Sequence, residues 1–292
     1  MIRKVFYASA GHSDLIGFHR AWKDDVHFAR EVSITFPSQI LDYCRDIGAS
    51  ISMTSVHTDG RRLEDGSVVI EHRPKRRASG LGFHVEELRH CIRMLRTARR
   101  FDADVALIDS GATHYFLLRL FPLFRIPVVV ILHNTLWPSG FPPTGRVKQA
   151  VQKLNARFWK RTPLAGIAVS PEAERQVRQL SPKHRTPMFQ IRAQFRPEHF
   201  DSIPPPPPHG EGPFQVMFIG RVTVEKGVLD IPQMAKRVEQ QQPGLVRWVI
   251  CGEGDALDEL RRLVEELGVG HVVEVKGWVS LEQLWEGLAA SH

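Results

Sequence analysis

The chain has 292 residues, of which 42% are hydrophobic and 24% charged, the composition of a soluble globular protein long enough for two domains. Its formal net charge of +7 indicates either an anionic partner (nucleic acid, a membrane surface or a phosphorylated small molecule) or simply a basic surface. Three cysteines without a CxxC pair argue against a disulfide framework and for a reduced, cytoplasmic protein.

Before residue 201, short apolar segments alternate with helical patterns. The predicted strands are Val5–Ala8, Ser50–Val56, Ser67–Glu71, Val105–Asp109, Val128–Leu132, Gly166–Val169 and Met188–Ile191. The predicted helices are Pro37–Ile47, His84–Arg100, Thr113–Phe121, Gly145–Lys160 and Pro171–Leu180, the last with Ser170 as its N-cap. Strands that are almost continuously apolar, alternating with helices, predict an α/β fold with a doubly wound parallel sheet covered on both faces.

Three other kinds of feature are not expected from the sequence. The N-terminal residues MIRKVFYASAGHSD contain too short an apolar run for a signal peptide. The apolar stretch 116–133 is interrupted by Arg119, Pro122, Arg125 and Pro127, so it does not predict a membrane span. The histidines show no HExxH or comparable spacing, and we therefore predict no metal.

A proline-rich segment divides the chain. Residues 201–212 read DSIPPPPPHGEG, and five consecutive prolines favour a stiff, extended spacer over a proline-rich binding motif. Beyond this segment, the predicted strands are Val216–Ile219, Val246–Ile250 and Val272–Val275, and the predicted helices are Val228–Gln240, Ala256–Leu267 and one from Leu281. We therefore predict a domain over residues 1–203, a linker over 204–213 and a second, partial domain over 214–292.

The first strand after the linker ends in a loop that carries two cations. Residues 218–227 read FIGRVTVEKG, which places Gly220, Arg221 and Lys226 between a strand and a helix. Ligands of open α/β sheets bind at this edge, where helix N-termini attract anions. A guanidinium that contacts two oxygens and a mobile ammonium suit a diphosphate. The alternative is that both cations are solvated loop residues.

Glycines also follow the next two predicted strands. Gly252 and Gly254 in CGEGD (251–255), and Gly277 in KGWVS (276–280), would allow the backbone to approach a ligand closely. No GxGxxG motif opens either half of the chain, which disfavours a dehydrogenase.

The segments FIGRVTVEKGVLDI, WVICGEGDALDELRRLVEELGV and VVEVKGWVSLEQLWEGL resemble the nucleotide-sugar-binding half of family 4 retaining glycosyltransferases. The resemblance implies a GT-B architecture of two Rossmann-like domains and a nucleotide-diphospho sugar as donor, without a metal or a covalent cofactor. Arg221 and Lys226, in the motif G-R-x4-K-G, would hold the donor diphosphate, and Trp278 and Val279 would face the nucleobase. The complete donor-binding set implied is Gly220, Arg221, Lys226, Gly252, Gly254, Trp278 and Val279.

The first half resembles the same family more loosely, through VALIDSG, VVVILHN and IAVSPEAERQV. The resemblance implies that His133, which ends an apolar strand, is a catalytic residue near the transferred sugar. The alternative is a core histidine satisfied by backbone groups. The acceptor-side loop, SAGHSD, offers only Gly11 of an expected glycine pair, with His12 beside it. The implied acceptor is a carbohydrate or a lipid-linked molecule.

Basic clusters occur at HRPKRR (72–77) and RHCIRMLRTARR (89–100). In the second cluster Leu88, Cys91, Ile92 and Leu95 form the predicted apolar face, and arginines occupy the rest of the helix. We favour a solvated arginine-rich helix over a patch that contacts an anionic membrane at its cytoplasmic, inner face. Aromatic residues are not interleaved with these clusters, so we predict no nucleic-acid partner.

The donor domain of the resembled family normally continues with a Glu-x7-Glu segment that binds the sugar and ribose, and no such segment follows Leu281. We therefore expect this chain to be a C-terminally truncated fragment with negligible transferase activity of its own. Two alternatives to a retaining glycosyltransferase stay open. One is a nucleotide-sugar epimerase of the same architecture, which would turn over its donor without an acceptor. The other is a non-catalytic, basic surface-binding module.

Overall fold

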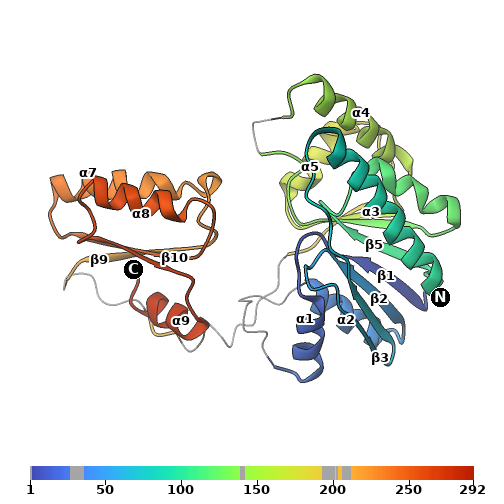
Figure 1. Ribbon diagram of the computed structural model, residues 1–292, viewed down its shortest axis with the longest axis horizontal. Helices are drawn as coiled ribbons and strands as arrows, with labels where there is room; N and C mark the ends of the chain where they lie inside the picture. The colour runs from blue at the N-terminus through green and yellow to red at the C-terminus, as the bar shows by residue number, and fades with distance from the viewer. Residues whose placement is uncertain (1, 27–35, 139–141, 193–200, 202, 206–211) are drawn as a thin grey trace. The chain divides into compact units, whose positions relative to one another are not determined.

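The computed structural model describes residues 2–26, 36–138, 142–192, 201, 203–205 and 212–292. The chain divides into two compact units, Met1–Gln194 and Phe195–His292, each built around its own sheet (Figure 1). The predicted linker, 204–213, includes residues 206–211, which lie outside the described residues, so its stiffness and its boundaries stay predictions. Within the described residues, no helix is long and apolar enough to cross a membrane.

The first unit contains an eight-stranded sheet. Its strands are β1 (Lys4–Ala8), β2 (Ser50–Ser55), β3 (Arg62–Asp65), β4 (Val68–His72), β5 (Val105–Asp109), β6 (Val128–Leu132), β7 (Ala165–Ala168) and β8 (Met188–Gln190). They lie in the order β3-β4-β2-β1-β5-β6-β7-β8, and all neighbours are parallel except β3 and β4. The strand order reverses between β1 and β5, which is where doubly wound sheets bind their ligands.

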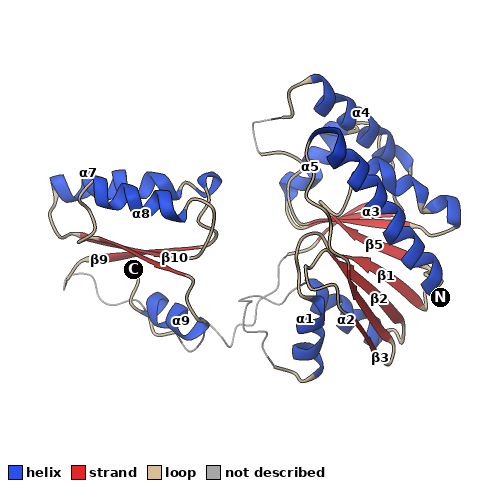
Figure 2. Ribbon diagram, in the orientation of Figure 1, coloured by secondary structure: helices blue, strands red, loops and turns tan. Residues whose placement is uncertain are grey.

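Helices cover both faces of this sheet (Figure 2). α1 (Leu15–Lys23) and α2 (Phe36–Asp46) lie on one face, and α3 (Gly80–Phe101), α4 (Arg146–Arg161) and α5 (Pro171–Leu180) lie on the other. Because successive residues of a strand point to opposite faces, Tyr7 of β1 packs in the core under α1 and α2, whereas Phe6 packs in the core under α3, α4 and α5. β6 reads VVVIL and is buried throughout. The prediction of a doubly wound parallel sheet is confirmed.

Two observed elements, α1 and β3, are absent from the sequence-based prediction. α1 begins after Asp14, whose carboxylate accepts a hydrogen bond from the Gly17 amide at 2.9 Å. β3 pairs antiparallel with β4 through a tight turn at Gly66, which has φ +59°. The two loop residues, Gly66 and Ser67, are a hairpin signal, but the charged residues of RLED hide the strand that precedes them.

Two other elements differ from their predicted form. The helix predicted at Thr113–Phe121 is a 3-10 segment, η1 (Tyr115–Leu120). A separate 3-10 turn, η2 (Pro122–Phe124), follows, because Pro122 has no amide hydrogen with which to continue η1. In α3, Cys91 and Leu95 are buried as predicted, but Leu88 is 40% exposed. The adjacent Glu87 faces inward instead and forms an ion pair with Lys75.

The second unit contains three parallel strands, β9 (Phe214–Ile219), β10 (Val246–Cys251) and β11 (Val273–Gly277), in the order β11-β10-β9. α7 (Ile231–Gln241) and α8 (Leu257–Glu266) lie on one face and α9 (Leu281–Ala289) on the other (Figure 2). α9 approaches β9 closely at Gly287, where a Cβ atom would lie 2.7 Å from the Met217 side chain. The predicted helix 228–240 begins with a 3-10 turn, η4 (Val228–Asp230), before α7.

One aromatic and one aliphatic side chain near the 3-10 segments test the packing of the first unit. Phe121 is fully buried, whereas Leu123, two residues later, is 74% exposed. We expect Phe121→Ala to lower the free energy of unfolding of the first unit by about 3–5 kcal/mol, because a large cavity is left in the core. Leu123→Ala should change it by less than about 0.5 kcal/mol. Urea unfolding followed by circular dichroism measures both, and equal losses would contradict this packing.

Candidate functional site

Backbone hydrogen bonds join the three loops that follow β9, β10 and β11. The Gly220 amide donates to the Cys251 carbonyl at 3.1 Å, and the Gly252 amide donates to the Gly277 carbonyl at 2.7 Å. These bonds extend the contact between the strands past their carboxyl ends. The structure therefore brings the predicted donor loops together at one edge of the sheet, while their binding of a donor stays a prediction.

Val222 fixes the loop after β9 to the loop after β10. Its side chain is fully buried in the core formed with α7 and α8. Its amide donates to the Glu253 carbonyl at 2.9 Å, and its carbonyl accepts from the Ala256 amide at 3.1 Å. A buried side chain and two backbone hydrogen bonds therefore hold the residue next to Arg221 in place.

Gly252 and Gly254 make this contact between loops possible. A Cβ atom on Gly252 would lie 1.8 Å from the Gly220 carbonyl oxygen, and one on Gly254 would lie 2.1 Å from the Val222 carbonyl oxygen. The sequence predicts that these glycines let the backbone approach a ligand. In the structure, the atoms close to these glycines belong to the loop after β9. The absence of a side chain at Gly252 and Gly254 therefore allows the two loops to pack against each other.

Arg221 and Lys226 flank a short segment that ends in a 3-10 turn, η3 (Val224–Lys226). Both side chains are exposed, and neither forms an ion pair with any residue that the structure describes. Gly227 follows with φ +70°, a conformation that favours glycine. Between the two cations, the Thr223 hydroxyl is buried and has no hydrogen-bond partner among the described residues. Two unneutralised cations and an unpaired hydroxyl suit an anionic ligand. Sequence analysis missed Thr223, although its place between the cations is visible there.

The loop after β11 presents an aromatic side chain. Trp278 is 61% exposed and follows Gly277, which is buried and has φ +72°. At the other end of the loop, the Ser280 hydroxyl accepts from the Gln283 amide at 3.3 Å, and the Gln283 side chain accepts from the Ser280 amide at 3.0 Å. This capping box fixes the start of α9. Trp278 and the half-buried Val279 therefore lie in a short loop that is held at both ends.

At the carboxyl edge of the first unit, His133 lies beside Asp109. The Nε2 atom of His133 is 3.0 Å from Oδ1 of Asp109, and Oδ2 of Asp109 accepts from the Tyr7 hydroxyl at 2.7 Å. The backbone amide of His133 donates to the Ser110 hydroxyl at 3.1 Å. The Phe36 ring meets the imidazole edge-on, with 5.0 Å between the ring centroids. The side chain of Asp109 is 5% exposed and that of His133 29%, so the imidazole is held on its buried side and open on the other.

The Asp109 carboxylate sets the orientation of this imidazole. With a carboxylate as acceptor, Nε2 carries a hydrogen and donates it to Asp109. Burial, followed by the charge of Asp109, raises the pKa of Tyr7 well above its usual value, so the Tyr7 hydroxyl remains a donor to Asp109. Sequence analysis missed Asp109 and Tyr7 as neighbours of His133. The available signal was a carboxylate that ends the apolar strand VALID.

The predicted acceptor-side loop follows β1. Gly11 has φ +85°, and its carbonyl accepts from the Val56 amide at 3.2 Å. The imidazole Nδ1 of His12 lies 3.0 Å from the Val56 carbonyl, to which it donates. The Ser55 hydroxyl donates to the Ser13 carbonyl at 2.7 Å. The segment after β2 therefore holds this loop, and the role of Gly11 and His12 toward an acceptor stays a prediction.

A pocket of about 310 Å³ opens between the loops after β5 and β6 and helix α4. Hydroxyl and amide side chains are frequent in its lining, which includes Ser110, Thr113, His114, Asn134, Gln152 and Asn155. Ser110 also accepts from the His133 amide, so the pocket adjoins that residue. The side-chain oxygen of Gln152 is buried without a hydrogen-bond partner among the described residues. A ligand with several hydroxyl groups matches this lining.

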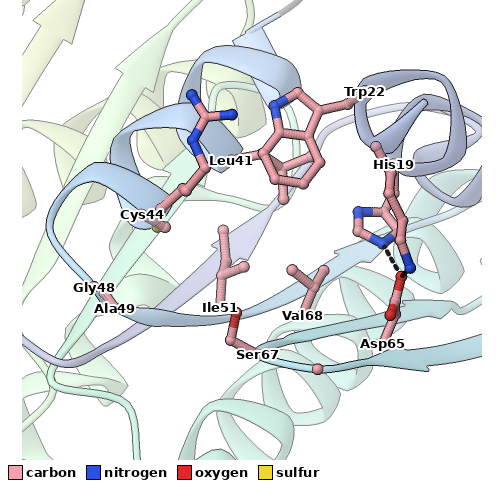
Figure 3. A pocket seen from close by; sticks show the side chains of 13 residues that line it. His19, Trp22, Leu41, Cys44, Gly48, Ala49, Ile51, Asp65, Ser67 and Val68 are labelled. Carbon is pink, nitrogen blue, oxygen red and sulfur yellow. Dashed lines mark hydrogen bonds and ion pairs between the residues drawn. The ribbon is translucent and has the colours of Figure 1, made fainter. Parts of the chain in front are cut away.

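A second pocket, of about 360 Å³, lies at the opposite edge of the same sheet (Figure 3). Ile51 and Val68, near the amino ends of β2 and β4, line it together with His19 and Trp22 of α1. Because open α/β sheets bind their ligands at the carboxyl edge, this pocket is not part of the candidate site.

The second unit matches a known family model. Residues 200–292 match the model described as glycosyl transferases group 1. No curated protein gives a significant match to the sequence.

Solved structures resemble the whole chain. It is similar to sucrose-phosphate synthase from Thermosynechococcus elongatus, with a TM-score of 0.65, 14% identity, and coverage of 99% of this chain and 74% of that one. It is similar to alpha,alpha-trehalose 6-phosphate synthase from Burkholderia multivorans, with a TM-score of 0.65, 10% identity, and coverage of 99% of this chain and 76% of that one. It is also similar to WaaG, a glycosyltransferase involved in lipopolysaccharide biosynthesis, with a TM-score of 0.61, 10% identity, and coverage of 98% of this chain and 73% of that one. These likenesses confirm the predicted fold class, the GT-B type with Rossmann-like units.

The substitution Gly254→Ala tests the packing between the loops after β9 and β10. The new Cβ atom would meet the Val222 carbonyl oxygen at 2.1 Å, so the loops must separate. We expect a loss of about 1–3 kcal/mol in local stability, seen as faster amide hydrogen exchange in β9 and β10. Gly270→Ala is the matched control, because its nearest neighbour lies 3.8 Å away. Unchanged exchange in Gly254→Ala would show that the loops are not held together in solution.

Proposed function

We propose that the protein is a glycosyltransferase that moves a sugar from a nucleotide-diphospho-sugar donor to an acceptor hydroxyl, with retention of the anomeric configuration. The observation that carries this proposal is the loop Gly220–Gly227. It presents two exposed cations that have no ion-pair partner among the described residues, and it lies in the segment that matches the glycosyl transferases group 1 model. Retention rests on the resemblance of this segment to family 4 enzymes.

The proposed role of the loop follows from the charge that develops during sugar transfer. The bond between the anomeric carbon and the diphosphate oxygen breaks, and the diphosphate leaves with additional negative charge. Arg221 and Lys226 would stabilise that charge. The Thr223 hydroxyl, which is buried in this structure, would donate to a phosphate oxygen after its side chain turns toward the ligand. Because Val222 already fixes the loop, little ordering is needed on binding. These protein cations supply the charge neutralisation, so we propose neither a metal nor a covalent cofactor for the transfer step.

The proposed acceptor is a carbohydrate or a lipid-linked carbohydrate. The pocket beside His133 supports this proposal, because its hydroxyl and amide groups match a ligand rich in hydroxyls. His133 is oriented by Asp109 and exposes one side of its ring, which suits a residue that contacts the transferred sugar.

We also propose that the protein is cytoplasmic and contacts the inner face of a membrane. The first turns of α3 expose Leu81, Val85 and Leu88, by 85%, 47% and 40%. Two exposed arginines, Arg76 and Arg77, precede this helix. Exposed apolar side chains next to lysine and arginine are typical of helices that lie on anionic membranes.

Arg221→Ala and Lys226→Ala test the donor site. A hydrogen bond to a charged group contributes about 1.5–3 kcal/mol, and about 1.4 kcal/mol is tenfold in affinity. We therefore expect each variant to bind a nucleoside diphosphate at least about tenfold more weakly, measured by calorimetry with UDP, ADP and GDP.

Arg247→Ala is the control for this experiment. Arg247 is an exposed arginine of the same unit that pairs with Glu274 at 2.8 Å, and it lies at the amino end of β10. The control should bind like the parent chain. Equal affinities of all four proteins would refute the assignment of Arg221 and Lys226.

His133→Ala separates a role in catalysis from a role in the core. In an assay of sugar transfer, we expect it to lower kcat at least about tenfold, equivalent to about 1.4 kcal/mol of transition-state stabilisation, while the Tm changes by only a few degrees. His184→Ala is the control, because His184 bonds the Ser181 carbonyl at the other edge of the unit. A large fall in Tm with specific activity intact would mean that His133 is a structural residue.

A further inference from the structure

Three side chains of the first unit converge at the carboxyl edge of its sheet, outside the site described above. The His72 Nδ1 atom lies 2.6 Å from Oδ1 of Asp59, and the His57 Nδ1 atom lies 3.2 Å from the same oxygen. The two imidazole centroids are 4.8 Å apart. One nitrogen from each histidine and one carboxylate oxygen thus all lie within 4.8 Å of one another.

The fold brings these residues together from different elements. β2 and β4 are parallel neighbours, and Ser55 at the end of β2 pairs in register with His72 at the end of β4. His57 follows two residues after Ser55, and Asp59 lies in the turn that precedes β3. The two histidines are therefore adjacent in space although their positions in the sequence show no metal-binding spacing.

We propose that His57, Asp59 and His72 form a binding site for a divalent transition-metal ion, with Zn²⁺ as the best match. Two imidazoles and one carboxylate are ligands that Zn²⁺ prefers, and three protein ligands leave a fourth position for water. Ligand bonds of about 2.0–2.2 Å around a tetrahedral ion place the ligand atoms about 3.3 Å apart. The two histidine nitrogens now lie 2.6 and 3.2 Å from the Asp59 oxygen, and all three ligand atoms lie within 4.8 Å of one another, so side-chain rotations can bring them to that distance.

Groups around the three ligands fit the needs of a metal site. The Arg61 guanidinium pairs with Oδ2 of Asp59, whereas Oδ1 accepts from the Arg61 backbone amide at 3.2 Å and also faces the two histidines. The other ring nitrogen of His72, Nε2, lies 3.9 Å from a carboxylate oxygen of Asp14. Carboxylates behind ligating histidines are the usual partners that fix their orientation. The side chain of His72 is fully buried, whereas those of His57 and Asp59 are each 22% exposed, so an ion can enter from their side.

Metal binding requires a change of tautomer at His72. Without the ion, Nδ1–H donates to Asp59 and Nε2 accepts from the Ile16 amide at 3.4 Å, a long and therefore weak hydrogen bond. With the ion, the Nδ1–H bond breaks, a metal–Nδ1 bond forms, and Nε2 takes up a proton. Nε2 then loses the Ile16 hydrogen bond, and it must move closer to Asp14, now 3.9 Å away, to donate to that carboxylate. One ring nitrogen loses a hydrogen and the other gains one, so this exchange releases no net proton.

The position of the ion gives it a structural role. The segment after β2 that carries His57 and Asp59 also holds the acceptor-side loop, through the bonds of Val56 to Gly11 and His12. An ion that ties this segment to the end of β4 would reduce the motion of that loop. This role is separate from the transfer step proposed above, so either proposal can fail without the other.

The experiment uses the chain freed of metal with a chelator and then titrated with Co²⁺ and Zn²⁺. We expect the absorption bands of tetrahedral Co²⁺, saturating at one ion per chain, and displacement of Co²⁺ by Zn²⁺. His57→Ala and Asp59→Asn should each weaken Co²⁺ binding at least about 100-fold. Loss of a metal ligand lowers the metal affinity more than loss of a residue that only hydrogen-bonds to a ligand. Because His57 is partly exposed at a turn, His57→Ala should retain the fold, which the Tm of the metal-free variant verifies.

His84→Ala is the matched control. His84 and His114 form another close pair of imidazoles, with ring nitrogens 2.9 Å apart, and the control should bind Co²⁺ like the parent. Nitrogen NMR of the imidazoles should show His72 changing from Nδ1–H to Nε2–H when Zn²⁺ binds. Equal Co²⁺ affinity of His57→Ala and the parent, a loss of binding in His84→Ala alone, or an unchanged tautomer of His72 would each overturn the proposal.

Discussion

Burial of both faces of the parallel strands determines where chemistry can occur in this protein. β6 places five apolar side chains in the two cores, and an unpaired polar group at any of these positions would cost several kcal/mol. Reactive side chains are therefore found where strands end. Asp109 and His133 follow this rule at β5 and β6, and His72 follows it at β4. The carboxyl edge of the sheet carries the candidate chemistry because little else of the sheet can accommodate a polar group.

The two units use their carboxyl edges in different ways. In the first unit, side chains bond to one another, as in the series Tyr7, Asp109 and His133, and the neighbouring pocket is lined mainly by uncharged polar groups. In the second unit, backbone groups bond to one another, and glycines allow the loops to touch. Arg221 and Lys226 of this unit form no ion pair with any described residue. One edge suits a neutral ligand with many hydroxyls, and the other suits an anion.

The fold could be predicted from the sequence wherever local signals and tertiary burial agree. α5 has the predicted bounds because the Ser170 hydroxyl accepts from the Ala173 amide and Pro171 is compatible with the first helical position. β5 and β6 have the predicted bounds because parallel strands buried on both faces read as continuous apolar runs. β3 was missed because an edge strand needs no such run.

The candidate site was predictable only in part. The cations of the loop after β9 are adjacent to a glycine signal that is visible in the sequence. The bond between Asp109 and His133, and the convergence of His57 and His72, depend on which strands are neighbours, and spacing along the chain does not contain that information. The roles of Gly252 and Gly254 could not be predicted either, because the backbone that they contact belongs to another loop.

The short strands at the two margins of the eight-stranded sheet affect how this protein behaves at high concentration. An unpaired strand edge is a template on which a second chain can add a strand, and long, flat, apolar edges lead to aggregation. β3 consists of four residues, three of them charged, and runs antiparallel to its neighbour, while β8 at the other margin has three residues. Neither strand has a long row of unpaired amide and carbonyl groups with which a second molecule could pair. The margins of this sheet thus favour solubility while its strongly apolar interior is being assembled.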